Sequence, residues 1–293
     1  MKISFVKSGL PASGVVVVTA IAGGKLSSSA VELDKNAGGI LKRAIQGSNF
    51  NGKKGQTLNI LAPEGAKLDR VLLVGLGKVS DVTDLEMQKL GGRIYAETKQ
   101  TKKGLVTVVL DLIKDVKMST AEMASEIAFG ANLRSYRFDK YKTKLKPENK
   151  PSIKSLTIAC VSYVNARKKY SSLAKIVDGV FFTRDLVSEP PNILYPDTLA
   201  KQAKTLEKLG IKVQILGETQ MKRLGMGALL GVGQGSIRES RLVVMEWNGA
   251  PKGKDKKVQP VAFVGKGVTF DTGGISIKPS AGMEDMKWDM GGS

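Results

Sequence analysis

The 293 residues carry 46 Lys and Arg against 27 Asp and Glu, a net charge of +19, and include no histidine and one cysteine, Cys160. The length allows two domains with a sizeable core, while the missing histidine excludes Ser-His-Asp and Cys-His catalysis, HExxH chemistry and Cys/His zinc sites. Because the sequence offers no internal disulfide and no apolar run of roughly 18 residues, we expect a cytoplasmic protein that does not span a membrane. Without histidine, any hydrolytic chemistry would have to use carboxylates, lysines, hydroxyls or a metal.

The first half of the sequence alternates strand and helix patterns. Residues 1–20 predict a strand, a turn and a second strand rather than a signal peptide, because Lys7, Pro11 and Gly14 interrupt the apolar run. Later β-branched segments predict strands, and two longer segments predict helices, the second capped by Ser119 or Thr120. The alternation predicts an α/β sheet with helices on both faces. The second of these strands is 14–20, the later strands are 57–62, 70–77 and 105–112, and the helices are 84–100 and 119–136.

A basic connector follows at residues 133–154, where lysines and arginines are interleaved with Tyr136, Phe138 and Tyr141. This composition would suit the stacking of nucleic-acid bases, but an exposed connector whose aromatic rings attach it to a domain surface explains it as well. We expect a domain boundary near residue 150, then a strand at 155–162. A long helix from about residue 170 to 188 must end there, because Pro190 and Pro191 cannot continue it.

The pattern restarts after Pro196. A helix over residues 197–210 is expected to take Asp197 or Thr198 as its N-cap and to end at Gly210. The remaining expected elements are a strand at 211–217, a short helix at 218–225, a glycine-rich turn region at 225–236, and strands at 241–249 and 258–267.

Two glycine-rich segments do not predict a nucleotide site. The segment GLGKVS, residues 75–80, lacks the glycines of both the P-loop and the GxGxxG pattern, so a tight strand-to-helix turn suffices. Gly231, Gly233 and Gly235 indicate close backbone approach without chemistry of their own.

The segment VGKGVTFDTGGISIKPSAGMEDMKWDMGGS, residues 264–293, carries most of the chemistry. Lys266 ends an apolar run, Asp271 stands before Gly273, and Lys278 and Asp289 follow at intervals of 7 and 11 residues. A carboxylate between glycines suits a hard metal ion, because both of its oxygens are free and the backbone can bend around the ion. The alternative is an ordinary ion pair between the aspartate and a neighbouring lysine.

These residues resemble the signature region of the leucyl (cytosol) aminopeptidase family, whose form is VGKGxTFDxGGxxxKP followed by MxxMKxDMxG. The segments YRFDKYKT, TRDLVSEPPNILYP and GMGALLGVGQGS agree with the family too. The resemblance implies an N-terminal macro-domain-like α/β domain at residues 1–155, a linker with a long helix at 156–190, and the start of a catalytic α/β domain with a mixed sheet at 191–293.

For the site, the resemblance implies a two-metal exopeptidase that removes N-terminal leucine and other apolar residues from peptides. Lys266, Asp271 and Asp289 match the family's ligands for two divalent ions, manganese or zinc, with Asp271 bridging them and Lys266 binding as a neutral amine. Lys278 matches the catalytic lysine that stabilises the oxyanion. Met286 matches a residue of the substrate pocket, and the ions would also hold the substrate's α-amine.

One family motif is absent. NTDAEGR, which supplies the remaining metal ligands and an arginine, does not occur in the chain, so we expect a C-terminally truncated member. Alone it is expected to bind at most one metal weakly and to show no measurable activity. Glu284, Asp285 and Lys287 match no functional position and suit a solvated helix face.

The resemblance also bears on the oligomeric state and on the binding partners. The family forms hexamers, which the resemblance implies for a full-length protein. The alternative to a peptidase is a DNA-binding regulatory module, because the charge of +19 suits a nucleic-acid partner. A non-catalytic remnant is the third possibility.

Overall fold

The computed structural model describes residues 1–249 and 259–293, and the chain divides into two compact units, Met1–Phe181 and Phe182–Ser293. Each unit is α/β, with parallel and antiparallel strand pairs in the first and an antiparallel pair in the second. This confirms the predicted fold class. The division into residues 1–155, 156–190 and 191–293 stays a prediction.

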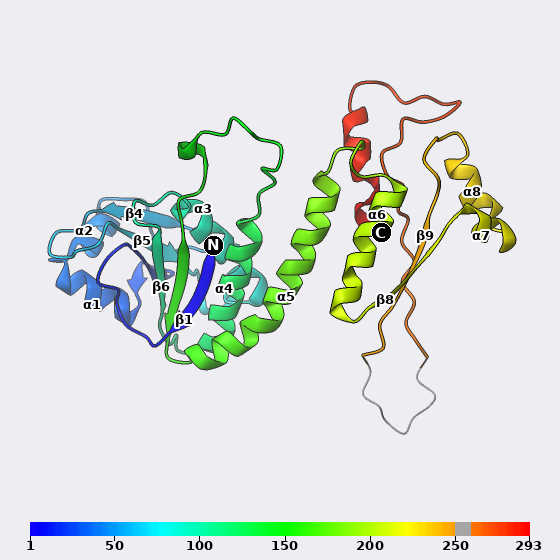
Figure 1. Cartoon of the computed structure of the whole chain (residues 1–293). Helices are drawn as coiled ribbons and strands as arrows, with labels where there is room; N and C mark the ends of the chain where they lie inside the picture. The colour runs from blue at the N-terminus through cyan, green and yellow to red at the C-terminus, as the bar shows by residue number, and fades with distance from the viewer. Residues whose placement is uncertain (250–258) are drawn as a thin grey trace. The chain divides into compact units, whose positions relative to one another are not determined.

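The first unit is built on one mixed sheet with the strand order β1-β7-β6-β2-β5-β4, and the short β3 pairs with β2 (Figure 1). The pairs along the path from β1 to β5 are parallel, whereas β4 and β3 run antiparallel to their neighbours. Every strand expected in this half is present. The bounds are β1 Lys2–Val6, β2 Val15–Ile21, β3 Lys25–Leu26, β4 Thr57–Leu61, β5 Arg70–Gly75, β6 Leu105–Leu110 and β7 Ser155–Cys160.

Two hydrophobic cores lie on opposite faces of this sheet. In β2, Val15 and Val17 belong to one core while Val16 and Val18 belong to the other, as the two-residue repeat of a strand requires. All four valines are buried, which is why the segment is continuously apolar instead of alternating. The strong β-propensity of valine and burial on both faces therefore specify the same structure.

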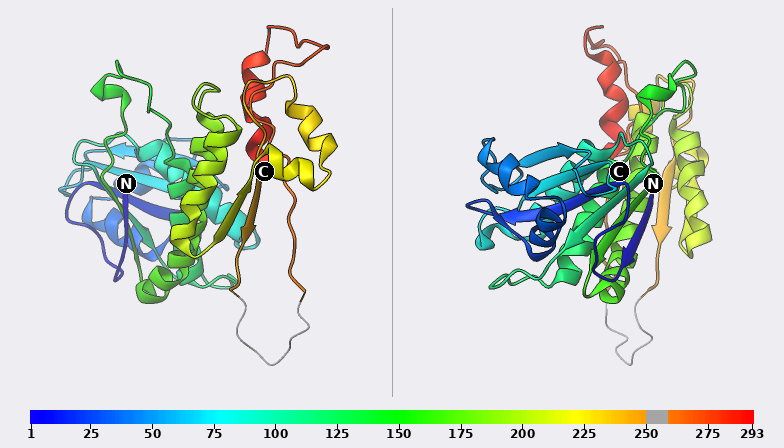
Figure 2. Two further views of the ribbon diagram at one scale, coloured as in Figure 1. Left: turned by 45° about the vertical axis from the view of Figure 1, so that its right-hand side comes forward. Right: turned by 90° about the vertical axis from the view of Figure 1, so that its left-hand side faces the viewer.

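The helices of the first unit cover these two faces (Figures 1 and 2). The core of Val16 and Val18 takes in α1 and α2, which the sequence analysis did not predict, and the opposite core takes in α3 and α4. Ser119 is the N-cap of α4, as predicted. The bounds are α1 Ser28–Asn36, α2 Ile40–Gln46, α3 Asp84–Thr98 and α4 Thr120–Arg134, with 3₁₀ turns η1 Val79–Asp81 and η2 Pro147–Asn149.

The basic connector runs between α4 and β7 with one 3₁₀ turn. The ring of Tyr136 lies 5.2 Å from that of Phe181, outside the connector, whereas Phe138 and Tyr141, 5.8 Å apart, contact each other within it. The Tyr136 contact fits a connector attached to the surface of the first unit. DNA binding by the connector stays a prediction.

The helix α5 spans Tyr163–Ser188, so it begins about seven residues before the predicted start. Its first turns join the core of the first unit, where Ala166 is fully buried and Tyr170 lies 5.5 Å from the ring of Phe5. It ends before Pro190, as predicted. Neither α5 nor any other helix of the described residues is long and apolar enough to cross a lipid bilayer.

The second unit has an antiparallel two-stranded sheet, β8-β9, with α6 against it. Gly210 adopts φ +86° where the 3₁₀ turn after α6 ends, as the sequence predicted for the residue that stops this helix. The bounds are α6 Pro196–Lys204, η3 Thr205–Leu209, β8 Lys212–Leu216, α7 Glu218–Arg223, α8 Gly227–Gly233, β9 Leu242–Glu246 and η4 Met283–Gly292.

Three local predictions in this unit were wrong. The N-cap of α6 is Tyr195, because the hydroxyl of Thr198 accepts a hydrogen bond from the Tyr195 N–H at 2.9 Å and so lies in the first turn. Part of the glycine-rich turn region forms α8, since the good helix formers Ala228, Leu229 and Leu230 lie between its glycines.

The third wrong prediction is the strand expected at residues 258–267. Val258 lies outside the described residues, and residues 259–267 form no strand. A strand needs a neighbour for its backbone groups, and among the described residues β8 and β9 pair only with each other.

Candidate functional site

Asp271 and Lys278 close a short turn. The Lys278 Nζ lies 2.7 Å from Asp271 Oδ2, and the Gly273 N–H donates to Asp271 Oδ1 at 2.8 Å. Gly273 has φ +95° and forms an isolated antiparallel bridge with Ile277, while the Lys278 N–H donates to the Thr272 carbonyl. The signal for this geometry is in the sequence, because an aspartate two residues before a glycine readily forms an Asx turn. This turn was not predicted.

The charges around Asp271 favour its ionised form. The hydrogen bond from Lys278 lowers the pKa of Asp271 most, the Gly273 N–H adds to the lowering, and the positive charge of Lys266 adds a smaller contribution. Asp271 and Lys278 are both partly exposed, with 42% and 30% of their side chains accessible. The turn therefore presents a carboxylate that stays charged and can be reached from solvent.

Lys266 and Asp289 come from the two segments on either side of this turn. Ser293 lies close to Gly265, because a Cβ added to Gly265 would be 2.7 Å from the Cα of Ser293. Ser293 also lies close to Gly267. The residues flanking Lys266 thus contact the end of η4, one turn beyond Asp289. Both predicted ligands are exposed.

The helix η4 carries the other predicted residues (red in Figure 1). Met290 is buried and attaches η4 to the unit, while Gly291 approaches Val187 near the end of α5. Met286 is partly buried. Of the three residues predicted for a solvated face, Glu284 and Asp285 are exposed and Lys287 is partly buried. The pocket predicted for Met286 stays a prediction.

Asp271 and Asp289 would supply only part of a divalent-ion site. Asp271 and Asp289 supply carboxylate oxygens of the kind that manganese and zinc accept. No group of three His, Cys, Asp or Glu side chains that could hold a metal occurs in the described ranges 1–249 and 259–293, so a site here depends on the amine of Lys266. Because Lys266 is exposed, the described residues do not provide the dry surroundings that favour a neutral amine.

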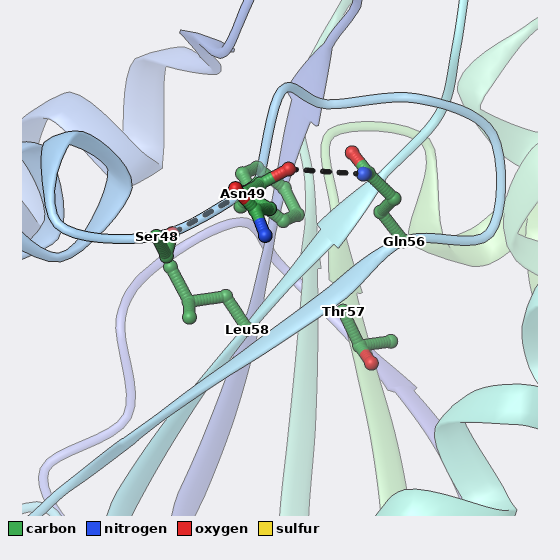
Figure 3. A pocket seen from close by; sticks show the side chains of 6 residues that line it. Ser48, Asn49, Gln56, Thr57 and Leu58 are labelled. Carbon is green, nitrogen blue, oxygen red and sulfur yellow. Dashed lines mark hydrogen bonds between the residues drawn. The ribbon is translucent and has the colours of Figure 1, made fainter.

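A hollow of about 210 Å³ in the first unit is separate from these residues (Figure 3). It is lined by Ser48, Asn49, Phe50, Gln56, Thr57 and Leu58. The Gln56 side chain accepts from the Asn51 and Lys53 N–H groups and donates to the Asn49 carbonyl. Its polar groups are thus used within the loop itself, which makes the hollow a feature of local structure.

Residues 15–145 match the model of the N-terminal domain of the cytosol aminopeptidase family, and residues 181–293 match the model of its catalytic domain. The chain therefore belongs to the cytosol aminopeptidase family, as the signature residues indicated.

Curated relatives match the whole chain. A probable cytosol aminopeptidase of Caulobacter vibrioides is 50% identical over 295 residues, which cover 100% of this chain and 58% of that protein. A probable cytosol aminopeptidase of Rhodopseudomonas palustris is 47% identical and is covered to 57% of its length. The chain thus spans somewhat more than half the length of these relatives.

Solved structures of similar fold agree. A bottromycin maturation enzyme, BotP, in complex with Mn is 25% identical with a TM-score of 0.71, and the match covers 96% of this chain and 54% of that one. A variant of tomato leucine aminopeptidase is 26% identical with a TM-score of 0.71, covering 83% and 50% of the two chains.

Proposed function

We propose that this chain carries part of the active site of a metal-dependent aminopeptidase, which releases N-terminal residues, preferably leucine and other apolar residues, from peptides. Family membership and the names of the relatives support the reaction class. The manganese in the complex of BotP supports a divalent ion. The relatives' name also supports the cytosol as the place of action.

The observation that carries the proposal is the pairing of Asp271 with Lys278 at 2.7 Å, inside the segment that the catalytic-domain model covers. In the proposed site Lys266, Asp271 and Asp289 hold the metal. When bound, divalent ions would act as Lewis acids on the scissile carbonyl and on water. Asp271 brings a carboxylate that is already charged, so no proton has to leave it on binding.

Lys278 has the second proposed role. A protonated amine close to the metal-binding carboxylate can donate hydrogen bonds to the negative charge that develops on the substrate's carbonyl oxygen. Met286, partly buried on η4, would contact the substrate's N-terminal side chain. Two metals, the NTDAEGR ligands and the hexamer belong to the whole protein and stay predictions.

A chimera tests this function. The chain would be continued with the part of the Caulobacter relative that it does not match, and assayed on leucine p-nitroanilide with manganese. We expect the chimera to be active, Lys278→Ala to lower kcat by about 10²–10³-fold, and the 293-residue chain alone to show no turnover above background.

Lys287→Ala is the matched control, since this lysine lies in the same segment with no assigned role. A folded chimera that does not cleave the substrate, or one that loses nothing on Lys278→Ala, would count against the proposal.

A further inference from the structure

We propose that Asn248 is a site of spontaneous deamidation, whereas Asn51, which stands in the same Asn-Gly sequence, is protected by the fold. Residues 247–249 read WNG and residues 50–52 read FNG, and these are the two Asn-Gly pairs of the chain. An aromatic residue precedes each pair, so the local sequences are closely matched. The structure around each pair therefore decides which asparagine reacts.

Deamidation of an Asn-Gly pair requires a rotation of the backbone. The main-chain nitrogen of the glycine attacks the asparagine Cγ and forms a C–N bond, while the bond from Cγ to the side-chain nitrogen breaks. That nitrogen leaves as ammonia with the proton of the glycine N–H. Water then opens the resulting succinimide ring at one of its two carbonyls and yields aspartate or isoaspartate. Glycine favours the attack because it has no side chain to hinder it.

The hydrogen bonds of Asn51 oppose this rotation. Its carbonyl accepts from the N–H groups of Gly23 and Gly24 at 3.0 and 3.2 Å, and its own N–H donates to Gln56 Oε1 at 2.9 Å. Rotation about the ψ bond of Asn51 would carry the carbonyl oxygen away from both donors. The reaction at Asn51 therefore first costs two backbone hydrogen bonds.

The attacking nitrogen at this site belongs to Gly52, which is buried. Gly52 has φ +65°, and a Cβ on it would overlap the carbonyl of Ile21 at the end of β2. The Gly52 carbonyl also accepts from the Gly77 N–H at 3.0 Å. Gly52 is thus held against the sheet, and the loop must open locally before Asn51 can react.

Asn248 and Gly249 lie in different surroundings. They follow β9, whose ladder with β8 ends at Glu246, and both are exposed. In the described ranges 1–249 and 259–293, no hydrogen bond involves Asn248 or Gly249. A Cβ on Gly249 would first meet the ring of Trp247, a side chain that is itself 72% exposed. The ψ bond of Asn248 can therefore turn without breaking a hydrogen bond to these residues.

The product would change the charge of the second unit. Aspartate and isoaspartate both place a carboxylate two residues after Glu246, which pairs with Lys212 at 3.3 Å. Isoaspartate also adds one carbon to the main chain, directly after the ladder of β8 and β9. The new charge therefore appears beside this sheet and outside its hydrogen bonds.

Peptide mass spectrometry measures the conversion at both sites. The 293-residue chain would be incubated at neutral pH and digested with trypsin at intervals, and deamidated peptides would be counted by their gain of one mass unit. We expect Asn248 to convert at least about tenfold faster than Asn51, because an opening that costs about 1.4 kcal/mol lowers the reactive population tenfold. In urea, which unfolds both sites, we expect the two rates to become similar.

Two variants test the cause. Gln56→Ala removes the acceptor of the Asn51 N–H and is expected to speed conversion of Asn51 roughly two- to tenfold while the rate at Asn248 stays the same. Circular dichroism checks that this variant folds. Asn248→Gln is expected to remove most of the conversion in the second unit, since a glutamine would have to form a larger ring.

The outcomes separate fold from sequence. Equal rates in the folded chain, or faster conversion at Asn51, would overturn the proposal. A difference between the sites that persists unchanged in urea would also overturn it, because local sequence would then set the rates. An unchanged Asn51 rate in a folded Gln56→Ala variant would overturn the role given to the loop's hydrogen bonds.

Discussion

Ser119 and Glu122 form a capping box at the start of α4. The Glu122 Oε2 accepts from the Ser119 N–H at 2.9 Å, and the Ser119 hydroxyl accepts from the Glu122 N–H at 3.3 Å. The Ser119 N–H, then the Ser119 hydroxyl and Lys169, lower the pKa of Glu122 to about 2. Because the folded-state pKa is lowered, the stabilisation is present above about pH 4.5 and is lost as the pH falls toward 2.

The first prediction follows from this box. Ser119→Ala should lower the free energy of unfolding by about 1 kcal/mol at neutral pH, and should move the titration midpoint of Glu122, followed by carbon-13 NMR, up from about 2. The ion pair with Lys169 is exposed and adds little.

Glu126, one turn further along α4, is the matched control. Burial raises the pKa of Glu126, so its ionised form costs stability at neutral pH, and the group gains stability as it becomes protonated. Glu122→Gln should therefore reduce the loss of stability on acidification, and Glu126→Gln should increase it. A Glu122 midpoint near 4.5 in the wild type would contradict the account.

Residue-scale chemistry was predictable where the partners are close in sequence. The cap at Ser119 follows from a serine three residues before a glutamate, and the ion pair of Asp271 was the alternative to a metal site. The approach of Ser293 to Gly265 and Gly267 was not predictable, because nothing local encodes a contact between residues that lie more than 20 positions apart.

At the scale of elements, α3 and α4 pack through glycines. A Cβ on Gly91 would meet the Ile127 carbonyl and one on Gly130 would meet the Gln88 carbonyl, both backbone atoms at distances no side chain can occupy. The helices thus approach along a line where their backbones touch. Around Gly92, the next residue, there is more space: the nearest atom would lie 3.7 Å from an added Cβ.

The second prediction compares these glycines. Gly130→Ala and Gly91→Ala should each destabilise the first unit by about 1–3 kcal/mol, because α3 and α4 must separate. Gly92→Ala should be neutral or stabilise by about 0.5–1 kcal/mol through helix propensity. Urea denaturation followed by circular dichroism measures both. Equal effects at Gly91 and Gly92 would refute the close approach.

Elements were predictable where local propensity and burial agree. The strands of the first unit are valine- and leucine-rich and lie in the sheet, so their composition specified them. The short helix α8 was predicted as a turn because of its glycines, although Ala228, Leu229 and Leu230 between them favour a helix. The apolar run at 259–267 has strand composition, but pairing with a neighbour, which composition does not encode, decides whether a strand forms.

At the scale of the whole molecule, the two units differ in how they bury apolar residues. The first unit has two continuous cores, whereas the second exposes large side chains, among them Val261, Phe263, Val264 and Ile275. Phe263 and Val264 are 94% and 98% exposed, which is unusual for a run of such residues.

The central claim is that Lys266, Asp271 and Asp289 together hold a divalent ion. Anomalous diffraction from crystals of the 293-residue chain soaked in manganese measures this most directly. We predict one manganese peak within about 2.0–2.2 Å of a carboxylate oxygen of Asp271 and of Asp289, with the Lys266 amine as a third ligand. A manganese ion held by other residues, or no peak while the three side chains lie apart, would contradict the account.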